Sequence, residues 1–378
     1  MQDAIVVGGG LVGMSIAYHL VQAGAKTLLI DRHDPGRATD AGAGIVAAAT
    51  IGSDSEAWFN FAVEAAAYYP LLIAQLQSEQ AGDTGYARCG ELVVAVSEDE
   101  LEPFEAAQSF IFARQQRRGQ PSPADLQLVS PSEARDLFPA LAPVQRALYD
   151  HQAARVDGRL LSQALRRAAE QRGLRVQNGS VERLLLKNQV VTGVAAAGEM
   201  LSADRVVIAG GAWSPAFEQQ LGLALPVWPQ RGQLVHLKLP GVETSHWPVV
   251  TAFRGHYLVA WPDSRVVAGA THEEVGFHPQ PTAAGMHEVL SEALRVAPGL
   301  AQAELREIRV GLRPRTVDGL PLIGPAPGVA QLHLATGHGA TGLHLGPYTG
   351  KVVAALMLGQ DAQADLTAFD PARFGWVA

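Results

Sequence analysis

The stretch "DAIVVGGGLVGMSIAYHL", residues 3–20, decides the fold, together with "LLIDR" at residues 28–32. An apolar run too short for a helix is followed by Gly8, Gly10 and Gly13, and then by an amphipathic run too long for a strand. A strand, a tight turn and a helix in this order aim free backbone N–H groups and the positive helix end at one point. The stretch therefore predicts a phosphate site at the start of a helix.

The glycine spacing is typical of a dinucleotide-binding turn. Gly8 lets the turn close, Gly10 lets a pyrophosphate approach the backbone, and Gly13 lets the helix lie close to the strand. Asp31 ends the next apolar run, where a carboxylate would accept a hydrogen bond from a ribose hydroxyl. A glycine-rich turn without a ligand is the alternative, but the strand, helix, second strand and acid are all present. The unit predicts dinucleotide binding and does not by itself choose between NAD and FAD.

Length and charge narrow the class of protein. A chain of 378 residues suggests two domains, and 48% hydrophobic with 17% charged residues is ordinary for a globular protein. The net charge is −8 and no segment concentrates positive charge, so we expect no nucleic-acid partner. The single cysteine, Cys89, can form neither an internal disulfide nor a cysteine-rich metal site, and we predict no metal.

The same features favour a cytoplasmic protein. One cysteine fits a reducing compartment, and the first strand begins too close to Met1 to leave room for a signal peptide. The apolar stretch "GAGIVAAATI", residues 42–51, is too short to span a bilayer. Peripheral membrane association stays open.

Two further strand ends open into glycine-rich turns. One is "VVIAGGAWSP" at residues 206–215, and the other is "LATGHGATGLHLGP" at residues 334–347. Either could be a tight turn and no more. Binding one mononucleotide does not require three strands that each end in a glycine-rich turn. An extended flavin dinucleotide would contact all three turns.

Several stretches in order carry a resemblance to a known family. Beside those quoted, they are "GRATDAGAGIVAAAT", "RVDGRLLSQALRRAAEQRG", "PQRGQLVHL", "HYLVAWPDSRVVAGAT" and "GLRPRTVDGLPLIGP", and together they span roughly residues 4–358. The chain resembles the D-amino acid oxidase superfamily of FAD-dependent oxidoreductases, most of all its glycine oxidase and D-amino acid dehydrogenase branch.

The resemblance implies an α/β fold with a glutathione-reductase-like FAD-binding Rossmann domain and a second, α+β substrate domain built on an antiparallel sheet. The expected FAD-binding domain is discontinuous and comprises residues 1–80, 145–220 and 318–370. The expected substrate-binding domain comprises residues 81–144 and 221–317.

The resemblance also implies which residues hold FAD. The first turn and the acid would bind the adenosine and pyrophosphate, the segment around Thr39 would lie along the flavin, and the last turn would lie by the pyrimidine end of the ring. The expected cofactor-binding residues are Gly8, Gly10, Leu11, Val12, Gly13, Asp31, Arg32, Thr39, Ala43, Gly44, Ile45, Val181, Ala209, Gly210, Trp213, Gly337, His338, Gly339, Ala340, Thr341 and Gly342. His338 has a simpler alternative, a histidine that only satisfies its turn. Some members of the family bind FAD covalently through a cysteine near the last turn or a histidine near the first flavin segment. This sequence has no cysteine in the former segment and no histidine in the latter, so we predict noncovalent FAD.

Two residues are expected at the substrate. A guanidinium offers a planar, bidentate fork for a carboxylate, and Arg313 occupies the place of the family's carboxylate-binding arginine. Tyr257 matches a tyrosine that adds a hydroxyl at the same carboxylate. Glycine oxidases that resemble this chain carry a second arginine where Ala340 stands. This departure argues against glycine and leaves room for a D-amino acid, an N-substituted glycine or a cyclic imino acid.

The implied reaction is oxidation of a carbon–nitrogen bond. A small amino acid or amine would give its α-hydride to flavin N5 and become an imine, which water hydrolyses to a keto acid or aldehyde. The electrons would pass to oxygen in an oxidase. The alternative is the catalytic subunit of a heteromeric dehydrogenase, similar to hydrogen cyanide synthase, opine or hydroxyproline dehydrogenases, with a quinone or a redox partner subunit as acceptor. A homo- or hetero-oligomer stays open.

Overall fold

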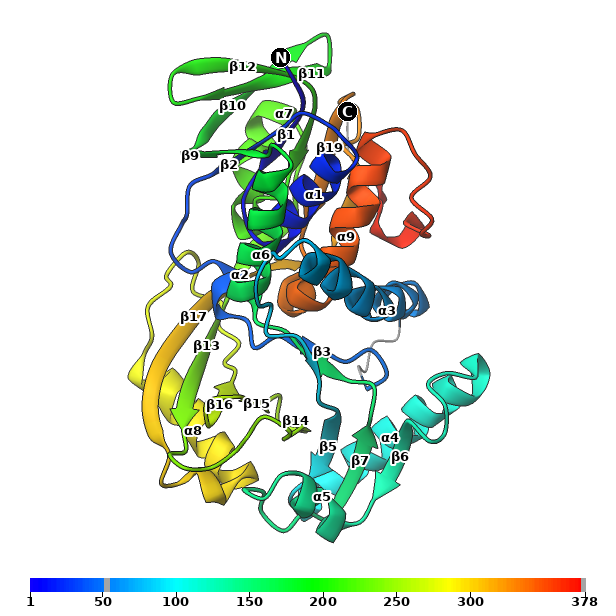
Figure 1. Cartoon of the computed structure of the whole chain (residues 1–378), viewed down its shortest axis with the longest axis vertical. Coiled ribbons are helices and arrows are strands. Elements are labelled where there is room, and N and C mark those ends of the chain that lie inside the picture. Colours follow the sequence, from blue (N-terminus) through cyan, green and yellow to red (C-terminus); the bar gives the residue numbers. More distant parts are fainter. Residues whose placement is uncertain (51–54, 375–378) are drawn as a thin grey trace.

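The computed structural model describes residues 1–50 and 55–374, and its elements form two large sheets (Figure 1). The first sheet has the strand order β10-β11-β12-β1-β2-β9, and β19 joins β12 while β18 pairs with β19. Its strands are β1 (Gln2–Val7), β2 (Thr27–Asp31), β9 (Arg175–Asn178), β10 (Val181–Lys187), β11 (Val190–Ala196), β12 (Glu199–Ile208), β18 (Leu322–Pro325) and β19 (Leu332–Thr336). The pairs that β1 makes with β2 and β12 are parallel, as in a Rossmann-like sheet.

Strand β1 is buried on both faces, which explains its continuous apolar run. Ala4 and Val6 face a core formed with four helices, α1 (Leu11–Gln22), α3 (Glu56–Ser78), α6 (Gly158–Gln171) and α9 (Gly342–Met357). Ile5 and Val7 face the opposite core, to which the β10–β11 hairpin and the short helix α7 (Glu218–Leu221) contribute. This packing places the first residues of α1 at the carboxyl end of β1.

The second sheet runs in the order β17-β13-β16-β15-β14-β5-β7-β6. All its pairs are antiparallel except β14 with β5. Its strands are β5 (Glu91–Ala95), β6 (Leu126–Val129), β7 (Arg146–Asp150), β13 (Val227–Lys238), β14 (Val249–Ala252), β15 (Tyr257–Trp261), β16 (Arg265–Gly269) and β17 (Glu304–Thr316). The predicted α/β fold with a second, substrate-side sheet is therefore confirmed.

Smaller elements complete the chain. A three-stranded sheet is formed by β3 (Ile45–Val46), β8 (Ala154–Arg155) and β4 (Ala87–Arg88). The remaining α-helices of the described residues are α2 (Ala38–Ala41), α4 (Leu101–Arg118), α5 (Pro131–Leu137) and α8 (Ala283–Val296). Within residues 1–50 and 55–374, no helix is long and apolar enough to cross a membrane.

The expected domain division stays a prediction, and one strand departs from it. Strand β7 lies in the segment 145–220 that we expected in the FAD-binding domain, but it pairs with β5 and β6 in the second sheet. Its consecutive apolar residues Ala147, Leu148 and Tyr149 are buried, and the strand pairs with strands that come earlier in the chain. The local sequence does not record this long-range pairing. Residues 51–54 of the expected first segment lie outside the described residues.

Candidate active site

A cavity of about 450 Å³ lies between the two sheets. One side is lined by the turns that follow β1, β2 and β12 of the first sheet. The other side is lined by residues of β13, β15 and β17 of the second sheet. Twenty of the expected site residues line it, namely Gly8, Gly10, Leu11, Val12, Asp31, Arg32, Thr39, Ala43, Gly44, Ile45, Val181, Ala209, Gly210, Trp213, Tyr257, Arg313, His338, Gly339, Ala340 and Gly342.

The first glycine turn has the backbone that its spacing predicts. Gly8 has φ +107°, and a Cβ there would lie 2.5 Å from the carbonyl oxygen of Ala209. A Cβ at Gly13 would overlap the carbonyl oxygen of Gly8, so Gly13 does not line the cavity but lets α1 approach β1 closely. A Cβ at Gly10 would have Thr39 Oγ1 at 3.4 Å as its nearest neighbour and would otherwise project into open space. The turn is therefore an open cradle at the helix N-terminus.

The N-terminus of α1 is available to an anion. Gly10 precedes the helix and has no side chain to cap it, and Leu11 N–H donates to Thr39 Oγ1 at 3.0 Å. Val12 lines the cavity, and none of the hydrogen bonds found among the described side chains engages its N–H. A pyrophosphate at this point would meet both the free N–H group and the positive end of the helix dipole.

Asp31 is held beside this turn at the end of β2. Its Oδ1 accepts from Gly9 N–H at 3.0 Å, and its Oδ2 pairs with Arg37 Nη1 at 3.0 Å. Arg37 also donates to the Gly9 carbonyl oxygen at 2.5 Å, so it links the acid to the glycine turn. The expectation did not include Arg37, although it stands in the quoted stretch "GRATDAG". Oδ2 also faces His33 Nδ1 at 3.1 Å, whereas Oδ1 keeps a further lone pair for a ribose hydroxyl.

The last turn begins α9. Gly337 and Gly339 adopt φ +78° and +53°, and Gly337 and Thr341 do not line the cavity. His338 lines the cavity but is buried, and its Nε2 lies 3.1 Å from Thr349 Oγ1 within α9. Burial lowers the pKa of His338 to about 4, so this imidazole is neutral at pH 7. Its hydrogen bond favours the simpler alternative, a histidine that satisfies its own turn and helix.

The residues present fit FAD. The open cradle before α1 suits a pyrophosphate, Asp31 suits a ribose, and the N-terminus of α9 opens on the same cavity. Val181 lines the cavity where the resemblance places the adenine. Among the described residues, no group of three histidine, cysteine or acidic side chains could hold a metal ion.

Arg313 and Tyr257 meet at the side of the second sheet. Arg313 is half-buried on β17, and its Nη1 donates to the Thr271 carbonyl oxygen at 2.9 Å. Gly232 on the paired strand β13 leaves room for the guanidinium, since a Cβ there would lie 2.5 Å from Arg313 Cζ. Burial raises the pKa of the Tyr257 phenol against the opposing effect of the Arg313 charge, so the hydroxyl stays protonated and can donate.

His272 is a cavity residue that the sequence reasoning missed. It is the residue after Thr271 in the segment that follows β16, and it lines the same cavity as Tyr257 and Arg313. Partial desolvation and then the positive charge of Arg313 lower the pKa of His272 to about 4, so its imidazole is neutral at pH 7. A lone histidine in a coil carries no periodic signal, and only the stretch "VVAGATH" at the end of a predicted strand could have drawn attention to it.

Comparisons with known proteins cover nearly the whole chain. The pattern of the DAO family, described as FAD dependent oxidoreductase, matches residues 3–356. An uncharacterized oxidoreductase, YurR of Bacillus subtilis (strain 168), is 41% identical over 374 residues, which are 98% of this chain and 99% of that protein. A glycine oxidase of Pseudomonas aeruginosa is 32% identical over 375 residues, 98% of this chain and 99% of that protein.

A solved structure extends the likeness to three dimensions. The crystal structure of an iminodiacetate oxidase (IdaA) from Chelativorans sp. BNC1 superimposes with a TM-score of 0.91 at 38% sequence identity. The match covers 97% of this chain and 98% of that chain. The likeness thus extends over both sheets.

Proposed function

The chain belongs to the DAO family of FAD-dependent oxidoreductases, and from this premise we propose that it oxidises the carbon–nitrogen bond of small N-substituted glycines. It is a flavoprotein enzyme that acts on C–N bonds and binds FAD.

The observation that carries the proposal is the state of Arg313. Its guanidinium lines the cavity, is anchored through Nη1 to one backbone carbonyl, and has no acidic partner within ion-pair distance among residues 1–50 and 55–374. A half-buried cation without an acid is costly to desolvate, and a substrate carboxylate would supply the missing charge. The protonated Tyr257 hydroxyl beside it can donate to the same carboxylate.

Two observations favour a substituted nitrogen over glycine. Ala340 lines the cavity with a methyl group, so this position adds no second cation and takes little space. The relative of known structure at 38% identity is named an iminodiacetate oxidase, and iminodiacetate is a glycine whose nitrogen carries a second carboxymethyl group. We therefore take iminodiacetate and N-alkyl glycines as the first compounds to test.

The chain's own residues bind and orient the substrate in this proposal. FAD, when bound, supplies the two-electron acceptor. Arg313 and Tyr257 hold the carboxylate, which fixes the position of the α carbon and its C–H bond. The neutral amine loses a hydride from carbon and a proton from nitrogen, and the resulting imine takes up water. An N-substituted glycine thus yields glyoxylate and the released amine.

The test is a substrate screen with purified holoenzyme. Iminodiacetate, N-methylglycine, glycine, D-alanine and an amine without a carboxylate are each assayed for glyoxylate or another carbonyl product, with oxygen and with an artificial electron acceptor. We expect the highest kcat/KM for an N-substituted glycine. A preference for D-alanine or for the carboxylate-free amine would contradict the proposed substrate class. The acceptor that supports faster turnover distinguishes an oxidase from a dehydrogenase subunit.

A further inference from the structure

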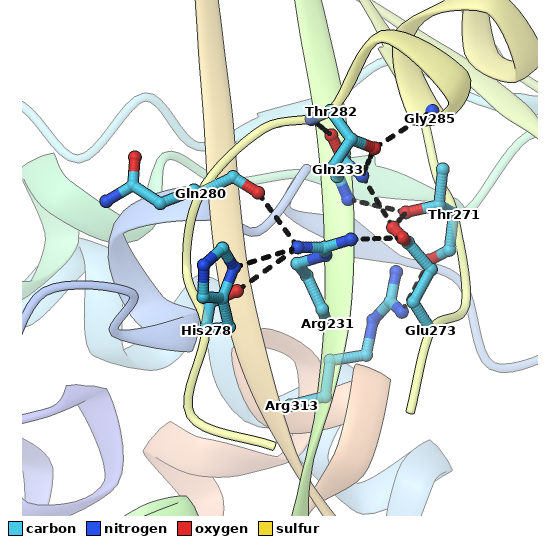
Figure 2. Close-up of polar contacts among 9 residues, drawn as sticks. All are labelled: Arg231, Gln233, Thr271, Glu273, His278, Gln280, Thr282, Gly285 and Arg313. Atoms are coloured by element: carbon cyan, nitrogen blue, oxygen red, sulfur yellow. Dashed lines mark hydrogen bonds and ion pairs between the residues drawn. The ribbon is translucent and has the colours of Figure 1, made fainter. Parts of the chain in front are cut away.

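A cluster of polar side chains lies next to Arg313 and contacts it through the Thr271 carbonyl oxygen. Arg231, Gln233, Thr271 and Glu273 form it, and we call it the Glu273 cluster (Figure 2). The Glu273 carboxylate forms an ion pair with Arg231 and accepts hydrogen bonds from Gln233 Nε2 at 2.6 Å and from Thr271 Oγ1 at 2.6 Å. Arg231, Gln233 and Thr271 are at most 4% exposed. The Glu273 side chain is 24% exposed, so the cluster is a charge-assisted network with buried donors and a partly exposed acid.

The Glu273 cluster pins the chain after β16 to strand β13. The backbones of Arg231 and Glu273 exchange two hydrogen bonds of 2.8 and 3.0 Å. Gln233 N–H donates to Thr271 Oγ1 at 3.0 Å, so the side chain of Thr271 is held from both sides. The position of residue 271 is thus set by side chains about forty positions earlier in the chain.

This anchored residue supplies the carbonyl that holds Arg313. Arg313 Nη1 donates to the Thr271 carbonyl oxygen at 2.9 Å, and the guanidinium passes over Gly232, which lies between Arg231 and Gln233 on β13. In Figure 2 Arg313 reaches toward the end of the cluster formed by Thr271 and Glu273. A bidentate contact with a carboxylate depends on the orientation of the guanidinium plane.

We propose that Glu273 is a positioning residue, which fixes the Thr271 carbonyl and thereby orients Arg313 toward the substrate carboxylate. The proposal rests on the proposed function of Arg313. Burial raises the pKa of Glu273, but hydrogen bonds from Arg231, Thr271 and Gln233 outweigh it and lower that pKa to about 2. The carboxylate is therefore charged throughout the pH range of an activity assay.

The experiment compares Glu273→Gln with Glu274→Gln. The neighbouring Glu274 is exposed and accepts from Gln230 Nε2 at 2.8 Å, outside the cluster, which makes it a matched control. We measure kcat and KM for the best N-substituted glycine, and the Kd of N-acetylglycine from its perturbation of the flavin absorbance. N-acetylglycine keeps the carboxylate, but its amide nitrogen is not oxidised. We expect Glu273→Gln to lose about tenfold to a hundredfold in kcat/KM, mainly through a higher KM, and to bind N-acetylglycine more weakly. Glu274→Gln should behave as the wild type.

A double variant separates positioning from general damage. In an Arg313→Lys background there is no fork left to orient, so adding Glu273→Gln should change the N-acetylglycine Kd by less than about twofold. If Glu273→Gln weakens N-acetylglycine binding equally in the wild type and in the Arg313→Lys variant, the proposal is overturned. If Glu273→Gln does not fold, Thr271→Val is used in the same cycle, because it removes the hydroxyl that links Glu273 to Gln233 N–H. An Arg313→Ala enzyme with unchanged Kd and kcat/KM would instead refute the proposed function itself.

Discussion

The Arg313 guanidinium lines the cavity, donates through Nη1 to the Thr271 carbonyl oxygen and interacts with the Tyr257 hydroxyl. Replacing it by alanine removes charge-assisted hydrogen bonds worth roughly 1.5–3 kcal/mol each. We therefore expect Arg313→Ala to lower kcat/KM for an amino acid by at least about tenfold to a hundredfold. Arg313→Lys should recover only part, because a point charge cannot reproduce the fork. Tyr257→Phe should cost less, since it removes one neutral hydroxyl.

Bound FAD per protein is the control for these three variants, because none of the substitutions touches the glycine turns. A carboxylate-free amine, if it is oxidised, should be nearly indifferent to all of them. Full activity of Arg313→Ala on an amino acid would remove the carboxylate role and move the substrate class toward simple amines.

At the scale of the element, the turn between β1 and α1 offers a test of the nucleotide site. Gly10 has φ −65° and ψ 176°, which any residue can adopt, and a Cβ there would meet no existing atom closer than 3.4 Å. We expect Gly10→Val to fold but to purify without colour, because its branched side chain occupies the pyrophosphate position. Absorbance near 450 nm per protein measures bound FAD.

Gly13→Ala is the contrasting variant within the same turn. Its Cβ would overlap the carbonyl oxygen of Gly8, so this change should lower the melting temperature of the whole chain. Circular dichroism and thermal unfolding of the apoprotein distinguish the two effects. A Gly10→Val protein that keeps stoichiometric FAD would show that the pyrophosphate lies elsewhere.

At the scale of the whole molecule, a buried acid makes folding depend on pH. Asp150 on β7 is 1% exposed and opposes the buried Glu91 on β5. Burial, followed by the charges of Glu91 and Asp125, raises the pKa of Asp150 from 3.8 to about 7. Between about pH 4 and pH 7, Asp150 is therefore mostly protonated in the folded protein and mostly ionised in the unfolded chain. The contribution of Asp150 to stability is therefore largest below that window and falls by roughly 1.4 kcal/mol per pH unit across it.

Chemical denaturation at a series of pH values measures this dependence. Asp150→Asn keeps an oxygen for the hydrogen bond that Asp150 Oδ1 accepts from Gln152 N–H at 2.9 Å, but it has no proton to lose. We expect the variant to lose less stability than the wild type between pH 5 and pH 8. Parallel pH profiles for the two proteins would contradict the raised pKa.

Features that depend on neighbouring residues could be predicted from the amino-acid sequence. The strand, glycine turn and helix at residues 2–22 could be predicted because Gly8 and Gly13 are required by contacts within one turn. Asp157 immediately precedes the helix α6, and its carboxylate accepts from the N–H groups of Arg159 and Leu160. Such patterns are local, so the chain records them directly.

Which distant segments share the cavity could be seen only in the folded chain. His272 and Arg37 stand in coil or short turns without periodicity, and two partners of Glu273, Arg231 and Gln233, lie about forty residues away on β13. Strand β7 joined the second sheet for a similar reason, since its register with β5 depends on pairing across fifty residues of chain. Contacts of this kind depend on packing and on hydrogen bonds between separate strands, and a residue's own neighbours in sequence carry no record of them.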